Sequence, residues 1–196
     1  RSRRPRAVLG HDDFCGSEGQ DALRATLDYV QARRDVARNR LAVFSFSMGL
    51  ALASRVLARD DGRLNVRLLL DWEGPADREA ILRTGALPPA ARTALAQDPE
   101  GFWHHREPIH SIADVPCDYL RIQSKVDHAL GARGRLGALA LVAAASRGKS
   151  SSAQLNDNPA GRSWRPEQAD DLRWAPSGAG PLNRLLLERL RERVLD

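Results

Sequence analysis

Lysine, cysteine and long apolar runs are all scarce in this sequence of 196 residues. Only Lys125 and Lys149 are lysines, so nearly all of the positive charge is arginine, and the net charge is +5. Apart from residues 1–6, the basic residues are spread along the chain, so we expect no nucleic-acid binding. The longest apolar run, 136–145, falls well short of the ~20 residues that a membrane helix needs, so we expect no membrane association.

Cysteine is limited to Cys15 and Cys117, which do not make a disulfide framework and show no metal-ligand spacing. A reduced, cytoplasmic protein is the expectation from this usage. Residues 1–6 contain neither an initiator methionine nor the apolar core of a signal peptide. A processed end and a piece of a longer chain both remain open as explanations of this start.

Nucleotide-binding motifs are also missing. The sequence has neither a Gly-x-Gly-x-x-Gly string nor a Walker loop, so a nucleotide-binding α/β domain has little support and we predict no cofactor. His104 and His105 stand side by side and suggest a metal, but no Asp, Glu or Cys accompanies them at ligand spacing. We therefore predict no metal site.

What is present is an alternation of short apolar runs with helical ones. This pattern predicts an α/β fold in a single domain, 1–196, with a mostly parallel sheet and helices on both faces. The predicted strands are 6–10, 41–45, 64–71, 117–123 and 152–156, and the predicted helices are 20–38, 48–59, 134–147 and 181–194. Residues 158–180 are expected to be a loop. Residues 75–115 contain helical pieces separated by Gly and Pro, which predicts a small helical insertion or cap.

One string of five residues carries chemistry. Ser45-Phe46-Ser47-Met48-Gly49 lies between an apolar strand and an Ala-rich helix, which is the context of a nucleophile elbow. Residues two positions from the nucleophile must be small, and Ser45 and Gly49 meet that condition. The turn would aim the Ser47 hydroxyl above the sheet and the Met48 N–H at a developing oxyanion. The alternative is that Ser47 only caps the helix.

With two further segments, this string resembles the α/β-hydrolase superfamily, most closely its dienelactone-hydrolase-like and peptidase-like branches. The Gly-rich loop 11–19 is similar to one that precedes the elbow in that family, and 119–128 resembles the segment that carries the catalytic acid. The sequence departs from the family at Ser45, where the usual residue is Gly. The resemblance implies Ser47 as nucleophile and Asp127 as the acid that orients the base, with Asp71 as an alternative acid.

The base is the least determined member of this set. The family places its histidine in the loop after the last strand, here near 156–159, but the sequence has no histidine after His128. Since a serine hydroxyl needs a base with a pKa of about 6.5 to take its proton, another histidine must serve. His128 beside Asp127 is the first candidate. His104 and His105, from the predicted cap, are the alternatives.

The front of the family's sheet has no counterpart in this sequence. In the family, three strands precede the one matched to 6–10, and the third donates an oxyanion N–H. Without that third strand, two strands of the sheet would each have one unpaired edge. The chain could be a shortened piece of a longer protein. Its first strand could instead take the missing place, with Gly10 and His11 lining the oxyanion site. A partner copy could also complete the sheet, giving a homo-oligomer through the exposed edge.

Two functions follow from these features. The first is an esterase-like serine hydrolase that acts on a small ester, lactone or other acyl substrate, with Phe102 and Trp103 as the apolar wall of the acyl pocket. The second is a binding or assembly module of the same fold that has lost catalysis, which the missing late histidine and the missing front strands both favour.

Overall fold

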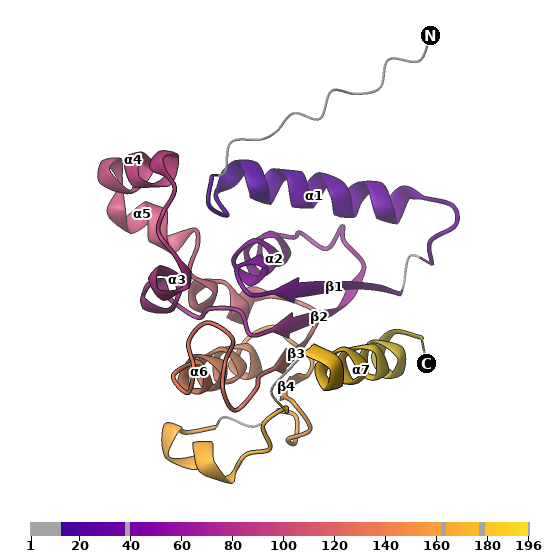
Figure 1. The fold of residues 1–196 in the computed structure, drawn as a ribbon. Coiled ribbons are helices and arrows are strands. Elements are labelled where there is room, and N and C mark those ends of the chain that lie inside the picture. The colour runs from indigo at the N-terminus through magenta and orange to yellow at the C-terminus, as the bar shows by residue number, and fades with distance from the viewer. Residues whose placement is uncertain (1–12, 38–39, 162–163, 177–178, 196) are drawn as a thin grey trace.

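The computed structural model describes residues 13–37, 40–161, 164–176 and 179–195, and it has an α/β architecture (Figure 1). Four parallel strands form one sheet in the order β1-β2-β3-β4. Their bounds are β1 Leu41–Phe46, β2 Val66–Trp72, β3 Asp118–Ile122 and β4 Ala153–Leu155. The predicted fold class is confirmed. The strand predicted at 6–10 lies outside the described residues.

The longer helices are α1 Ser17–Ala32, α2 Gly49–Ala58, α6 Gly134–Arg147 and α7 Ala179–Leu190. Their positions agree with the four predicted helices, except that α1 ends at Ala32 because the backbone of Arg33 is extended. The last helix passes into a π-helical turn, η4 Arg191–Leu195, and the expected loop contains a 3₁₀ helix, η3 Pro166–Asp171. Of the described helices, none is long and apolar enough to cross a membrane.

Different helices cover the two faces of the sheet (Figure 1). Successive side chains of a strand point to opposite faces, so Leu69 packs with α2 and α6 whereas Leu68 packs toward Leu186 of α7. The strand β1 differs from its neighbours on the α7 face. There Phe44 is 49% exposed and Phe46 is 47% exposed.

The connection between β2 and β3 is a run of short helices: α3 Arg78–Thr84, α4 Pro89–Gln97, α5 Pro99–His104, η1 Pro108–His110 and η2 Ile112–Asp114. Asp77 and Asp98 cap α3 and α5, since their carboxylates accept the N–H groups of Ala80 and Gly101. The run has a small core of its own, formed by Ile81, Leu87, Ala91, Phe102 and Trp103.

Candidate active site

Ser47 occupies the sharp turn between β1 and α2. Its φ is +50°, in the left-handed region, which costs a residue other than glycine about 1–3 kcal/mol. Its N–H donates to the Trp72 carbonyl at 2.9 Å, and its own carbonyl accepts the Leu50 N–H at 3.2 Å. The first turn of α2 therefore follows directly on the last bond between β1 and β2. This turn holds Ser47 at the carboxyl edge of the sheet.

The small neighbours of Ser47 allow the helix to pass close over the strand. A Cβ atom added to Gly49 would lie 3.6 Å from the Ser45 Cβ, which is van der Waals contact. The buried Ser45 hydroxyl lies 3.4 Å from Asp71 Oδ1, so it has a polar neighbour where the hydrolase family has glycine. Serine is thus accommodated at position 45, and a larger side chain would push α2 from the sheet.

His128 lies beside this serine. Its Nε2 is 3.2 Å from Ser47 Oγ, which places a base within reach of the hydroxyl. The imidazole comes from the loop after β3 and not from the loop after β4. The His128 backbone N–H donates to Glu73 Oε2 at 3.1 Å, and this bond holds the loop against the end of β2.

Glu73 is the carboxylate partner of His128, and sequence reasoning missed it. Its Oε2 lies 2.7 Å from His128 Nδ1, and its Oε1 accepts the Ser124 N–H at 3.0 Å. An ionised carboxylate only accepts, so this contact favours the tautomer with the proton on Nδ1 and leaves Nε2 to accept from Ser47. A signal was available: Glu73 directly follows β2, so it lies at the same carboxyl edge of the parallel sheet as Ser47.

Asp127, the predicted acid, has other partners. Its Oδ1 accepts the backbone N–H groups of Ala129 and Leu130 at 2.8 and 2.9 Å, and its Oδ2 accepts Gln123 Nε2 at 2.9 Å. The same Oδ1 is 3.6 Å from His128 Nδ1, which is too far for a hydrogen bond. Asp127 therefore shapes the loop that carries His128, and Glu73 is the carboxylate that touches the imidazole.

Asp71, the alternative acid, forms a buried ion pair with Arg121, and the Tyr119 hydroxyl donates to it at 2.9 Å. Arg121 also donates to the Gly74 carbonyl at 2.8 Å. Burial lowers the pKa of Arg121, but the charge of Asp71, its hydrogen bond to Arg121 and the other acidic groups nearby together outweigh burial, so the pKa is raised overall. Burial and then the Asp71 charge raise the pKa of Tyr119 well above its usual value. Asp71 thus neutralises a buried cation beneath the site.

The loop after β4, where the hydrolase family has its base, contains two buried asparagines that bind backbone. Asn156 Oδ1 accepts the Gln123 N–H at 2.9 Å. The Nδ2 atoms of Asn156 and Asn158 both donate to the Arg173 carbonyl at 2.9 Å. These bonds tie β3 to the segment that precedes α7. In this loop, the asparagine side chains therefore hold the backbone together, and none of its residues reaches Ser47 in the described contacts.

His104 and His105, the alternative bases, lie at the end of α5. The Nδ1 atom of His105 is 2.9 Å from Arg55 Nη2, and burial followed by the Arg55 charge lowers the pKa of His105. The His104 ring packs against the rings of His105 and His110, with centroids 5.4 and 5.3 Å apart. Among the contacts of the described residues, neither alternative reaches Ser47.

Met48 directly precedes α2, so its N–H is one of those at the helix start with no acceptor within the helix. Such an N–H beside the Ser47 hydroxyl is suited to stabilise an oxyanion. Phe102 and Trp103 are buried in the core of the helical run, and Met48 packs against that core. They contribute packing beside the elbow. Gly10 and His11, also predicted for this site, lie outside the described residues.

The side chains of Glu73, Asp127 and His128 could also hold a metal ion, because one ligand atom from each lies within 4.8 Å of the others. All four carboxylate oxygens, however, accept hydrogen bonds from the described protein groups. A cation would compete with these bonds for the carboxylate oxygens. The arrangement therefore suits an acid–base pair better than a metal centre.

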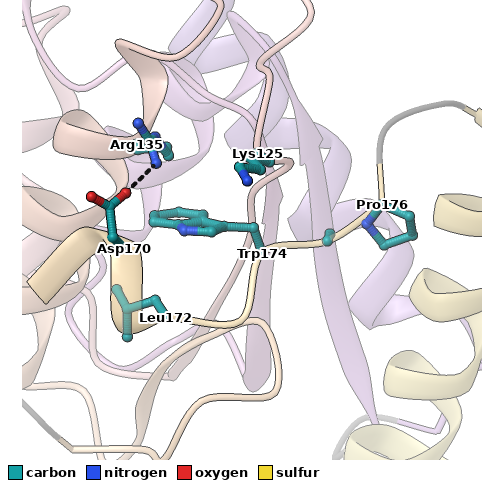
Figure 2. A pocket seen from close by; sticks show the side chains of 7 residues that line it. Lys125, Arg135, Asp170, Leu172, Trp174 and Pro176 are labelled. Atoms are coloured by element: carbon teal, nitrogen blue, oxygen red, sulfur yellow. Dashed lines mark hydrogen bonds and ion pairs between the residues drawn. The ribbon is translucent and has the colours of Figure 1, made fainter.

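A separate cavity of about 450 Å³ lies beside the loop that follows β3, and Figure 2 shows the side chains that line it. The Trp174 indole lies across it, and Arg135 pairs with Asp170 at its rim, with 3.2 Å between Nη1 and Oδ1. The lining residues are Lys125, Arg135, Asp170, Leu172, Trp174, Ala175 and Pro176. Ser47, Glu73 and His128 are not among them, so this cavity is distinct from the candidate active site.

No protein-family model matches the chain, and no curated protein matches its sequence.

Proposed function

We propose that the protein is a serine hydrolase in which Ser47, His128 and Glu73 form the catalytic triad. One observation carries the proposal: His128 lies between the other two, with Nε2 3.2 Å from Ser47 Oγ and Nδ1 2.7 Å from Glu73 Oε2. This is the order of contacts that nucleophilic catalysis by serine requires. The strand-turn-helix around Ser47 supports membership of the α/β-hydrolase superfamily as part of the same proposal.

The reaction we propose is acyl transfer to water. Ser47 Oγ attacks the carbonyl carbon of an ester while His128 Nε2 takes the hydroxyl proton, and the Met48 N–H stabilises the oxyanion. The bond to the leaving oxygen then breaks, and His128 returns the proton to that oxygen, so an alcohol departs. Water, activated by the same imidazole, hydrolyses the acyl-serine. Glu73 keeps the imidazole oriented and stabilises its positive charge in both halves.

The site supports a small ester, lactone or other acyl substrate. Ser47 is half-buried and His128 is exposed, so the reacting atoms are open to a molecule from solution. The apolar core behind Met48 is filled by the protein's own side chains. The acyl group therefore has to be accommodated above the elbow.

The test is covalent labelling by a fluorophosphonate probe together with hydrolysis of 4-nitrophenyl acetate. We expect wild-type protein to be labelled at Ser47, and the Ser47→Ala variant to lose both labelling and turnover. The matched control is Ser45→Ala, which removes a hydroxyl from the same strand and should keep both. Equal turnover by wild type and Ser47→Ala would sink the proposal.

Two other outcomes identify the competing interpretations. A folded wild-type protein that neither reacts with the probe nor hydrolyses esters would be a binding or assembly module. Turnover that disappears with a chelator and returns with a divalent cation, without probe labelling, would point to a metal at Glu73, Asp127 and His128.

A further inference from the structure

Three aromatic rings meet at the candidate site. The Phe46 ring lies 4.8 Å from the His128 imidazole and 4.7 Å from the Trp72 indole, measured between centroids, and both pairs are tilted. Phe46 directly precedes Ser47 and is the last residue of β1. Its ring is therefore attached to the same strand end as the nucleophile and flanks the base.

The Phe46 ring is also available to a ligand. The face of the sheet that carries Phe46 is covered over β2 and β3, where Leu68 and Leu120 pack with Leu186 of α7. Phe46 itself is 47% exposed, despite its contacts with His128 and Trp72. A half-exposed aromatic ring beside a reactive imidazole is an apolar surface that a substrate can cover.

The position of His128 decides which part of a substrate meets this ring. The leaving oxygen of an ester must take a proton from His128 Nε2, so it has to come within ~3 Å of that atom. The substituent on the leaving oxygen then lies beside the imidazole. Because Phe46 packs on that imidazole, the substituent falls next to the Phe46 ring, whereas the acyl group points away.

We infer that the Phe46 ring binds the alcohol portion of the substrate and that the preferred substrates are esters of arylmethyl alcohols or phenols. This inference rests on the proposed function, since it assigns His128 as the proton donor. A planar aromatic group can add a third ring to the tilted stack of Phe46 with Trp72 and His128. A short alkyl group of the same ester covers little of that surface.

The experiment compares esters that share one acyl group and differ in the alcohol: benzyl, cyclohexylmethyl and ethyl acetate. Their leaving alkoxides are of one chemical kind, so differences in kcat/KM report contact with the alcohol portion. We expect benzyl acetate to be the best substrate of the wild type. Phe46→Ala should reduce its advantage over ethyl acetate roughly ten-fold.

Phe44→Ala is the matched control. Phe44 is 49% exposed on the same strand face, and among the described ring pairs it stacks on neither His128 nor Trp72. The Phe44→Ala variant should keep the ratio of kcat/KM for benzyl acetate to that for ethyl acetate within about two-fold of wild type. Phe46→Leu keeps an apolar contact with His128 but removes the ring, so it should lose the preference for benzyl over cyclohexylmethyl acetate.

The outcomes separate this inference from the proposed function. If Phe46→Ala lowers kcat/KM equally for all three esters, Phe46 only positions His128 and the inference is wrong. If the wild type is labelled at Ser47 but shows no benzyl preference, the inference fails while the serine hydrolase stands. If the wild type is not labelled and hydrolyses none of the esters, the proposed function fails first.

Discussion

Two clusters of polar side chains lie next to each other at the carboxyl edge of the sheet, and they differ in what surrounds their charges. The buried cluster consists of Asp71, Tyr119, Arg121, Gln123 and Asp127, all 4% exposed or less. The open cluster consists of Ser47, Glu73 and His128, of which His128 is exposed. Each cluster contains a carboxylate at the carboxyl end of β2, Asp71 or Glu73, so position along the strand does not distinguish them.

The difference lies in the partner that each carboxylate finds. Asp71 pairs with a guanidinium, whose charge is permanent, and the pair is closed to solvent. Glu73 pairs with an imidazole, which can take up and release a proton, and the outer nitrogen of that imidazole contacts Ser47. A fixed, enclosed pair stabilises the fold, whereas a pair with one open end can move a proton.

The strongest test of this contrast is Glu73→Gln. The amide cannot hold the imidazolium in the same way, so we expect kcat for 4-nitrophenyl acetate to fall by roughly 10³ to 10⁴, as loss of the acid does in serine hydrolysis generally. The control is Asp127→Asn. It should weaken the loop bonds to Ala129 and Leu130, cost about 1–3 kcal/mol of unfolding free energy, and leave kcat within about ten-fold.

Steady-state rates and urea unfolding of both variants make the comparison. If Asp127→Asn abolishes catalysis and Glu73→Gln does not, then Asp127 is the catalytic acid, and the buried cluster rather than the open one supports catalysis.

Sequence reasoning reached most of the fold because the signals were local. Short apolar runs predicted β1 to β4, and apolar residues at helical spacing predicted the long helices; the helix predicted at 134–147 has the observed bounds of α6. The strand–turn–helix at Ser47 could also be predicted, because the residues that form it, Ser45, Ser47 and Gly49, are close in sequence.

The carboxylate partner of His128 was harder to predict, because it depends on which way two loops turn. Asp127 stands next to His128, but its side chain turns inward to Gln123 and to the loop amides. Glu73 is 55 residues from His128 and reaches it only because β2 and β3 are neighbours. Neighbouring strand ends bring such residues together, and one sequence does not show which strands are neighbours.

The next largest effect that we expect is a loss of stability when the ion pair of the buried cluster is broken. Arg121→Met removes the cation and leaves Asp71 buried without its partner, and the two side chains are 1% and 0% exposed. We expect a loss of about 3–5 kcal/mol of unfolding free energy in urea. Adding Asp71→Asn to Arg121→Met should recover part of this loss, because the uncompensated charge is gone.

A surface pair in the same protein supplies the control. On α3, Arg83 Nη2 lies 2.8 Å from Glu79 Oε1, and the two side chains are 45% and 74% exposed. Arg83→Met should change the unfolding free energy by no more than about 0.5 kcal/mol. If Arg83→Met and Arg121→Met lowered the unfolding free energy equally, burial of the Asp71–Arg121 pair would have no effect on stability.

The smallest expected effect is a loss of stability at high pH that comes from the buried cluster. Burial and the charge of Asp71 raise the pKa of Tyr119, so the folded protein holds this proton at a pH where an unfolded tyrosine, with a pKa of about 10, releases it. Unfolding then releases a proton, and stability falls as pH rises above about 10. Absorbance at 295 nm should show that Tyr119 ionises only on unfolding. Tyr119→Phe should flatten the decline, and the control Tyr29→Phe, at a residue that is 65% exposed, should preserve it. Ionisation of Tyr119 in the native protein would mean that the buried cluster is open to water.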